Sequence, residues 1–304
     1  RQAVAAALQK PRPLTHVAHG AARVERVASN RRVALSPEGK VKKMRGSACK
    51  DPELIALPDG LIDPMLKTIA FYEGETKRVA CHYYATHPMS YYGDGRVSAD
   101  FAGLARKQRQ HEEPDCTHIY FTGCAGNIAA GKYNEGTKEA RVQLTRRIHD
   151  GMVASETSLR PEPIGKASWR THEILPPPNP LFVPETLREA IANPKHGLAN
   201  RIRPAFTLSW MERVEQKMPL MLSALHIDNI SMLHLPAEAF IEYQLRAQAM
   251  QPKRVVATAA YGDGGPWYLP TREAYPQGGY EVSVAFCADA VDGMLTDAVR
   301  ALLS

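Results

Sequence analysis

A histidine followed by a proline is the first feature of the sequence that could do chemistry. The stretch "CHYYATHPMS", residues 81–90, reads as a buried strand that stops at Thr86, with His87 and Pro88 directly after it. Proline restricts the residue before it to extended geometry, so the backbone at His87 is stiff and its imidazole is aimed. Such a histidine can be a metal ligand, a general base or a well-packed turn residue.

A glutamate occupies a similar place later in the chain. In "MLHLPAEAF" a strand ends at Leu235 and Pro236, and Glu238 follows at the start of a predicted helix. The structural alternative is a glutamate in the first helical turn that offsets the helix dipole. A histidine and a glutamate from separate strand ends are ligands suited to Zn²⁺, which would leave a coordination position for water.

An aromatic, glycine-rich segment follows another predicted strand. Residues 261–281, "YGDGGPWYLPTREAYPQGGYE", carry Tyr261, Trp267, Tyr268, Tyr275 and Tyr280. The alternative to a functional role is a loop that packs its rings on the core. Strand ends and the loops beyond them are favoured places for function, because the scaffold fixes them while solvent reaches them.

The composition excludes several functional classes. The 304 residues are 44% hydrophobic and 23% charged, as is usual for a soluble globular protein. No stretch approaches the roughly 18 apolar residues needed to span a membrane. The net charge is +6, but the basic residues are scattered, and their densest cluster, residues 40–45, contains no aromatic residue. Nucleic-acid binding is therefore not supported.

The cysteines indicate no disulfide framework, and the first residues indicate missing upstream sequence. The five cysteines form no CxxC or zinc-finger pattern, and we expect most of them to be free and buried; they are Cys49, Cys81, Cys116, Cys124 and Cys287. The chain begins at Arg1 in "RQAVAAALQK", which reads as a helix already under way without a capping residue. We interpret this as a sequence that lacks upstream residues.

Strands and helices follow one another irregularly. Strands are predicted within residues 12–32, 66–74, 77–87, 117–123, 164–174, 219–236 and 253–260, and helices within 1–10, 99–110, 137–152, 184–193, 237–250 and 284–303. Ser98 and Thr137 can cap two of the helices, and residues 36–64 read as a polar loop. This order predicts an α/β (α+β) fold, in which a mixed β-sheet is covered by helices. We find no internal repeat, and we expect one domain over residues 1–304.

Several segments together resemble the neutral (alkaline, non-lysosomal) ceramidase family. "YYATHPMSYYGDGRVSADFAGLA", "TGCAGNIAAGKYN", "LPAEAF" and "YGDGGPWYLPTREAYPQGGYE" occur in the order, and with roughly the separations, seen in that family. "ASNRR" looks like its Asn-Arg element near the active site. The family is a group of zinc amidases that cleave N-acylsphingosine into a fatty acid and sphingosine. The resemblance thus implies a ceramidase-like catalytic domain, a Zn²⁺ cofactor and amide hydrolysis.

The resemblance also implies roles for single residues. His87 matches the zinc ligand of the family's His-Pro element, Glu238 the ligand of its Pro-Gly-Glu element, and Tyr268 its tyrosine ligand. Tyr280 matches an active-site tyrosine near the scissile group, and Arg31 matches an arginine that helps to hold the substrate. In these roles Tyr280 would donate a hydrogen bond to the developing oxyanion.

Two departures from the family pattern matter. The family takes a further zinc ligand from a His-x-His element, whereas His16 and His19 are spaced differently; we expect that ligand upstream of Arg1. The family's Gly-Asp-x-Ser-Pro loop reads here Gly126-Asn127-Ile128-Ala129-Ala130. Its catalytic serine is thus replaced by Ala129, whose methyl group cannot be a nucleophile.

The loop could still bind an oxyanion through backbone N–H groups near Gly126, Asn127 and Ala129, since a glycine allows close approach. The leading hypothesis is a zinc-dependent hydrolase that cleaves an amide (N-acyl) bond, as in N-acylsphingosine-like lipids, by zinc-activated water. Two alternatives stay open. One is a zinc esterase or amidase acting on a non-lipid acyl compound, and the other is a non-catalytic binding module on the same scaffold.

The resemblance carries two further expectations. A small-molecule or lipid substrate is the expected partner, and family analogy points to an exported protein, periplasmic or extracellular. The sequence stops at a helix that ends at Leu303 and Ser304, so we expect no C-terminal β-sandwich domain of the kind found in the family.

Overall fold

The computed structural model describes residues 1–91 and 95–304. Residues 92–94, which belong to the first ceramidase-like motif, lie outside the described residues. The helices are α1 (Gln2–Leu8), α2 (Pro52–Ala56), α3 (Asp100–Glu112), the 3₁₀ helix η1 (Gly131–Tyr133), α4 (Lys138–Glu156), α5 (Pro184–Ala192), α6 (Leu198–Glu215), α7 (Ile241–Met250), α8 (Ala274–Gln277), α9 (Tyr280–Ser283) and α10 (Val291–Leu303). The strands are β1 (His16–Arg23), β2 (Ser29–Asn30), β3 (Ala34–Leu35), β4 (Val41–Lys43), β5 (Met65–Glu73), β6 (Thr76–Tyr84), β7 (Thr117–Thr122), β8 (Ile128–Ala129), β9 (Glu162–Pro163), β10 (Ala167–Ile174), β11 (Leu220–Ile227), β12 (Ile230–His234), β13 (Glu238–Ala239), β14 (Val255–Ala259) and β15 (Tyr268–Leu269).

Two sheets carry most of the strands. The first has the order β7-β6-β5-β1-β9, and the second has the order β10-β11-β12-β14. In the first sheet, β6 pairs in parallel with β7 and antiparallel with β5. In the second sheet, β12 pairs in parallel with β14 and antiparallel with β11. Both sheets are therefore mixed, and the predicted fold class is confirmed.

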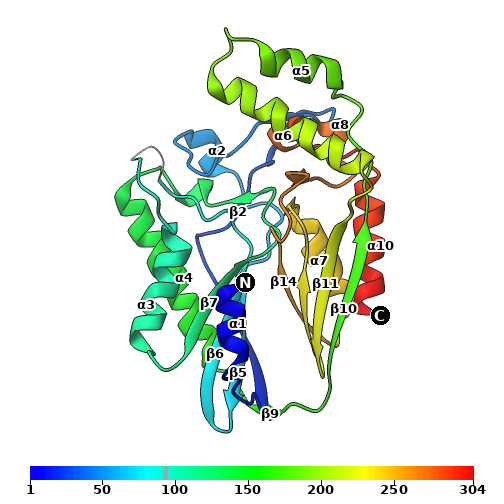
Figure 1. The fold of residues 1–304 in the computed structure, drawn as a ribbon. Coiled ribbons are helices and arrows are strands. Elements are labelled where there is room, and N and C mark those ends of the chain that lie inside the picture. Colours follow the sequence, from blue (N-terminus) through cyan, green and yellow to red (C-terminus); the bar gives the residue numbers. More distant parts are fainter. Residues whose placement is uncertain (92–94) are drawn as a thin grey trace.

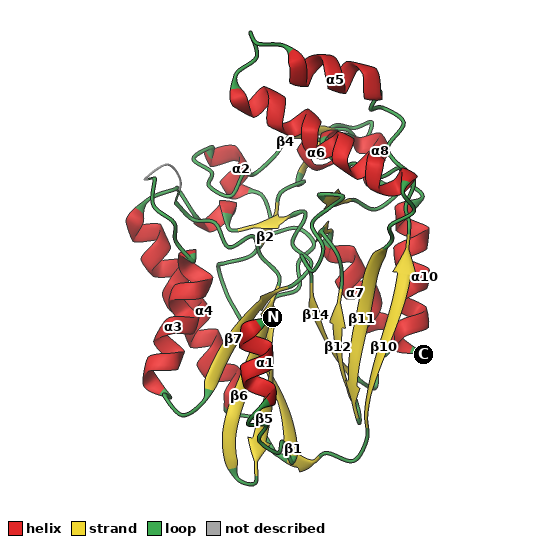
Figure 2. Cartoon of the chain, viewed as in Figure 1, coloured by secondary structure: helices red, strands yellow, loops and turns green. Residues whose placement is uncertain are grey.

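Helices cover the outer faces, and the two sheets pack on each other. Helices α3 and α4 contact the first sheet, whereas α7 and α10 contact the second. Between the sheets, Ile69 and Tyr83 from the first share a buried cluster with Met232 and Ala257 from the second. The layers thus run helices, sheet, sheet, helices, as Figures 1 and 2 show. Where the sequence predicted one covered sheet, the structure has two with an apolar core between them.

Local sequence signals explain many of the elements. The Thr137 hydroxyl caps α4 by accepting a hydrogen bond from the Ala140 N–H at 3.1 Å. Leu144, Ile148 and Met152 of the same helix are fully buried on one face, as their spacing of four predicted. All five cysteines are free and buried, as expected. None of the helices in the described part of the chain combines the length and the apolar character that crossing a bilayer requires.

Some predicted boundaries are wrong. The strand predicted over residues 12–32 is interrupted at Arg26, whose φ is 58°, so that β1 and β2 are separate. The predicted polar loop 36–64 contains β3, β4 and α2. The helix predicted from residue 237 begins at Ile241, and the closing helix begins at Val291. Helix α6 was missed, because Pro204 lies inside it and proline normally breaks a helix.

Two short ladders lie beyond the ends of the main strands and hold the residues of interest. Strand β2 pairs antiparallel with β8, and β13 pairs in parallel with β15. The second ladder places Glu238 directly opposite Tyr268. Glu238 therefore lies in a strand and not in the first turn of a helix, so the helix-dipole alternative is wrong.

Candidate metal centre

The position of His87 is fixed by the loop that contains β8. Its backbone N–H donates to the carbonyl of Ile128 at 3.0 Å, and its ring Nδ1 lies 2.9 Å from the same carbonyl oxygen. A carbonyl can only accept, so Nδ1 carries the proton and the neutral ring has its lone pair on Nε2. The residue is 7% exposed. Because the hydrogen bond at Nδ1 fixes the ring, Nε2 points away from Ile128.

Glu238 faces that nitrogen. Its Oε2 atom lies 2.9 Å from His87 Nε2. A carboxylate oxygen and an imidazole lone pair are both acceptors, so a proton or a metal cation must lie between them. The backbone of Glu238 is held by a hydrogen bond from its N–H to the carbonyl of Trp267 at 2.8 Å, which ties the glutamate to the aromatic segment.

Tyr268 supplies the third side chain with an atom that could bind a metal. Its hydroxyl lies 3.4 Å from His87 Nε2, and the two rings stack with their centroids 6.3 Å apart. Burial raises the pKa of the Tyr268 phenol, and Glu238 adds to this rise, while Arg31 opposes it. The phenol is therefore neutral at ordinary pH unless a cation favours the phenolate.

The two separations measured from His87 Nε2 are compatible with a zinc ion. Zinc bonds of roughly 2.0–2.1 Å in a tetrahedron separate neighbouring ligand atoms by roughly 3.3 Å. The separations of 2.9 Å between His87 and Glu238 and 3.4 Å between His87 and Tyr268 bracket that value. Three protein ligands with an open position are the usual pattern of catalytic zinc sites.

Arg31 and Tyr280 lie beside Tyr268, one of the three possible metal ligands. Arg31 places one guanidinium nitrogen 3.4 Å from the Tyr268 hydroxyl, and its Cζ lies 5.4 Å from the ring centroid of Tyr280. The fully buried Glu281 lies between Arg31, at 3.5 Å, and Arg32, at 3.0 Å. Burial alone would lower the pKa of Arg31, but Glu281 and Tyr268 outweigh it and the pKa is raised.

The loop of Gly126, Asn127 and Ala129 supports the centre from behind. The Gly126 N–H donates to the carbonyl of Ala239 at 2.9 Å, and the Asn127 side chain donates to Glu242 at 2.9 Å. Ala129 is fully buried. A Cβ atom at Gly126 would lie 2.2 Å from the carbonyl oxygen of Glu238, so only glycine allows this approach. The oxyanion role of the loop stays a prediction.

Backbone strain gathers at the same place. Ala237, Tyr261 and Trp267 have positive φ angles of 53°, 67° and 59° although none is glycine. Two of them directly precede Glu238 and Tyr268 in the sequence, and the Tyr261 N–H donates to the carbonyl of Ala237 at 3.0 Å. Such conformations cost energy and tend to cluster at active sites, although four further non-glycine residues with positive φ in the described chain lie elsewhere. The sequence shows no sign of them, because glycine is the residue that usually marks a positive φ.

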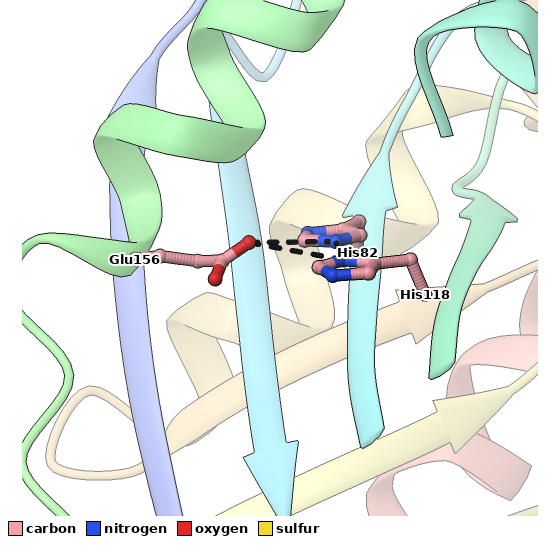
Figure 3. A group of neighbouring side chains, drawn as sticks. All are labelled: His82, His118 and Glu156. Atoms are coloured by element: carbon pink, nitrogen blue, oxygen red, sulfur yellow. Dashed lines mark hydrogen bonds and ion pairs between the residues drawn. The ribbon is translucent and has the colours of Figure 1, made fainter. Parts of the chain in front are cut away.

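A second group of possible ligands lies within the first sheet. His82 of β6, His118 of β7 and Glu156 at the end of α4 converge there, as Figure 3 shows. His82 Nε2 lies 2.9 Å from His118 Nδ1, and Glu156 Oε1 lies 3.8 Å and 3.9 Å from these two atoms. In residues 1–91 and 95–304 the other such group is Glu113, Cys116 and His118.

The two sites differ in what already binds their carboxylates. Glu156 accepts hydrogen bonds from Arg109 at 3.1–3.2 Å and also pairs with Lys77. A dication there would have to displace buried cations, which is costly. Glu238 faces His87 Nε2 at 2.9 Å, and the nearby Arg31 acts on it only at longer range, without a direct ion pair. The strand-end site is therefore better suited to a metal, and the His82 group reads as a hydrogen-bonded network. Sequence analysis missed this network, since it depends on the parallel register of β6 and β7.

Comparison with known proteins defines the fold. No family model and no curated protein matches the sequence. A neutral ceramidase from Pseudomonas aeruginosa superposes with a TM-score of 0.68 at 15% identity over 99% of this chain. The fold is ceramidase-like. A structure described as a ceramidase complexed with C2 superposes equally well, with a TM-score of 0.68 at 14% identity over 98% of the chain.

The ceramidase-like fold agrees with the family that the sequence motifs resemble. The chain spans only 54% of the length of each of these two structures. At this identity the match concerns the fold, and the metal, the reaction and the substrate are proposals.

Proposed function

We propose that the protein is a zinc-dependent hydrolase that cleaves an amide (N-acyl) bond. The observation that carries this proposal is the pair of facing acceptors, His87 Nε2 and Glu238 Oε2 at 2.9 Å, in a ceramidase-like fold. His87, Glu238 and Tyr268 would hold the ion. When bound, Zn²⁺ supplies Lewis acidity for an acyl carbonyl and a water nucleophile at neutral pH.

The surrounding residues would bind and orient the substrate. Arg31 is charged and buried, and it would hold an acyl oxygen close to the donors through the guanidinium nitrogen that also contacts Tyr268. The Tyr280 ring lies 5.8 Å from the Tyr268 ring, and its hydroxyl would donate a hydrogen bond to the oxyanion that develops during attack. Burial around these groups strengthens both interactions.

The substrate class follows from the fold and from Ala129. An N-acylsphingosine-like lipid amide is the first candidate, because the fold is ceramidase-like. A non-lipid acyl ester or amide is the second, because the buried Ala129 offers no hydroxyl group where the resembling family has a serine. Turnover of labelled ceramides against short acyl amides separates the two, and brisk ceramide hydrolysis would exclude the second.

Metal content tests the proposal directly. Elemental analysis of the purified chain, and of a form extended upstream, should show nearly stoichiometric zinc that is lost in His87→Ala. His19→Ala is the matched control, because His19 is exposed on β1 and should not affect the metal. Zinc in the extended form alone would indicate a further ligand upstream of Arg1. No zinc in either form would favour the non-catalytic binding module.

A further inference from the structure

The helical hairpin of α5 and α6 is attached to the rest of the molecule at one end. Near the end of α6, Trp210 is 1% exposed, and Arg213 binds Asp263 through two hydrogen bonds of 2.9 Å and 2.8 Å. The first half of α6 projects beyond this anchor together with α5, at the end of the molecule that holds α8, as Figure 1 shows. The hairpin thus offers a surface that the main core does not cover.

That surface is an apolar stripe. Leu198, Ile202 and Phe206 follow one another at intervals of four, so they lie on one face of α6. They are 72%, 39% and 56% exposed. Leu181 and Val183, in the connector before α5, are likewise exposed, at 77% and 49%. Adjacent apolar side chains exposed in this way are typical of an interaction site.

Positive charge flanks the stripe. Arg201 and Arg203 lie on opposite edges of it, since each is about 100° of helical rotation from its centre at Ile202. The Nε atom of Arg201 donates to the carbonyl of Ile191 at 2.7 Å, so only its two terminal nitrogens can reach another partner. No acidic residue occurs between Leu198 and Met211. Arginines at the edges of an apolar helical face can bury their stems and reach phosphate groups with their guanidinium ends. This is the pattern of a helix that lies in a membrane interface.

The stripe continues into a cavity that Trp267, the residue before Tyr268, also lines. Phe206 lines a cavity of about 340 Å³ together with Trp210, Trp267 and Phe286. The ring of Phe206 contacts that of Trp267 edge to face at 6.4 Å, and Trp267 stacks on Tyr268 at 6.2 Å. An aromatic path therefore joins the exposed face of α6 to the proposed zinc ligand.

We propose that this face of α6 docks the protein on a lipid bilayer that carries anionic headgroups. Charge complementarity selects this partner. A twofold dimer through the same face would bring four arginines into one interface, and residues 198–211 offer no acidic side chain to pair with them. An anionic bilayer offers the apolar stripe a hydrocarbon boundary and both arginines phosphate groups. The inference does not rest on the proposed hydrolysis, because docking can be measured without a substrate.

Sedimentation with lipid vesicles tests the proposal on the full chain. We expect it to bind vesicles of phosphatidylcholine with added phosphatidylglycerol, and to bind pure phosphatidylcholine more weakly. Leu198→Gln with Ile202→Gln should weaken partitioning at least about tenfold, which corresponds to ~1.4 kcal/mol. Arg203→Gln should weaken it roughly fivefold on the anionic vesicles alone.

The control makes the same kind of substitution, apolar to glutamine, outside α6. Val142→Gln with Met221→Gln changes two side chains of similar exposure, 68% and 57%, on α4 and β11, and should leave partitioning unchanged. Circular dichroism should show all variants folded. Absence of binding, or equal binding by the Leu198 and Ile202 variant, would overturn the proposal. So would a dimer in solution that this variant disrupts, since the face would then be a self-association surface.

Discussion

The Nε2 atom of His87 and the Oε2 atom of Glu238 lie 2.9 Å apart, although 151 residues separate them in the sequence. The hydrogen bond from His87 Nδ1 to the carbonyl of Ile128 leaves Nε2 as an acceptor. The pair therefore needs a shared proton or a cation between the two atoms. This relationship distinguishes the strand-end site from the buried network around Glu156, where Arg109 and Lys77 already supply the positive charge.

Zinc binding should ionise Tyr268. Its phenol is protonated at neutral pH because burial raises its pKa, and a ligand must lose its proton to bind a metal. Titration of the metal-free protein with Zn²⁺ should therefore produce the near-ultraviolet difference spectrum of a tyrosinate and release a proton. Tyr268→Phe should abolish this signal, whereas Tyr280→Phe should retain it. A tyrosinate signal that persists in Tyr268→Phe would remove Tyr268 from the ligand set.

Stability should fall in mild acid because of His82 and His118. Burial lowers the pKa of both imidazoles in the folded protein, so the unfolded chain binds more protons below its own histidine pKa of about 6.5. As pH falls through that value, the free energy of unfolding should decrease by up to ~1.4 kcal/mol per pH unit for each histidine. Urea unfolding over this range should show it, and a smaller slope is expected in His82→Asn. An unchanged slope would mean that other groups cause the loss.

A methyl group at residue 126 should damage the fold and the centre together. The added Cβ of Gly126→Ala would lie 2.2 Å from the carbonyl oxygen of Glu238, so the β13 backbone must move, at a cost of about 3 kcal/mol. Gly293→Ala is the control, since nothing lies within 4 Å of its added Cβ, and in α10 it should stabilise by about 0.5–1 kcal/mol. Urea unfolding measures both. Equal stabilities of the two variants would contradict the close approach at Gly126.

The backbone strain at Ala237 should be measurable by comparing the stabilities of Ala237→Gly and Ala239→Gly. Both alanines are fully buried next to Glu238, but Ala237 has a positive φ of 53°. Each change to glycine removes one buried methyl group, and at residue 237 it also relieves a left-handed conformation that costs ~1–2 kcal/mol. Ala237→Gly should therefore be less destabilising than Ala239→Gly by about that amount in urea unfolding. The opposite order would show that the conformation is not strained.

Local pattern singled out residues that the structure brings close together. His87 was chosen because a proline follows it at the end of a buried strand, and Tyr268 because it lies in a motif; their roles as ligands stay predictions. Glu238 was found with the wrong local structure, since its pairing with Tyr268 in β13 and β15 joins distant segments. Helix α6 was hidden by Pro204.

Other features could not be predicted because they arise only from packing. The proximity of His82 and His118 requires β6 and β7 to be neighbours in parallel register, and Glu156 reaches them from the far end of α4. The face-to-face packing of two sheets depends on which side of each strand meets the other sheet, and the periodicity of a single strand does not name its partner.

The two short ladders have a consequence for the order of folding. Arg31 and Tyr268 are 237 residues apart in the chain, and both lie in segments that only the docked sheets bring together. Contacts of such long sequence separation form late, since the entropy of closing the loop must be lost before the contact can stabilise anything. The cluster of His87, Glu238 and Tyr268 therefore assembles after the strands and helices that carry it. Its appearance marks the completion of folding, and a partly folded chain can have native secondary structure without this cluster.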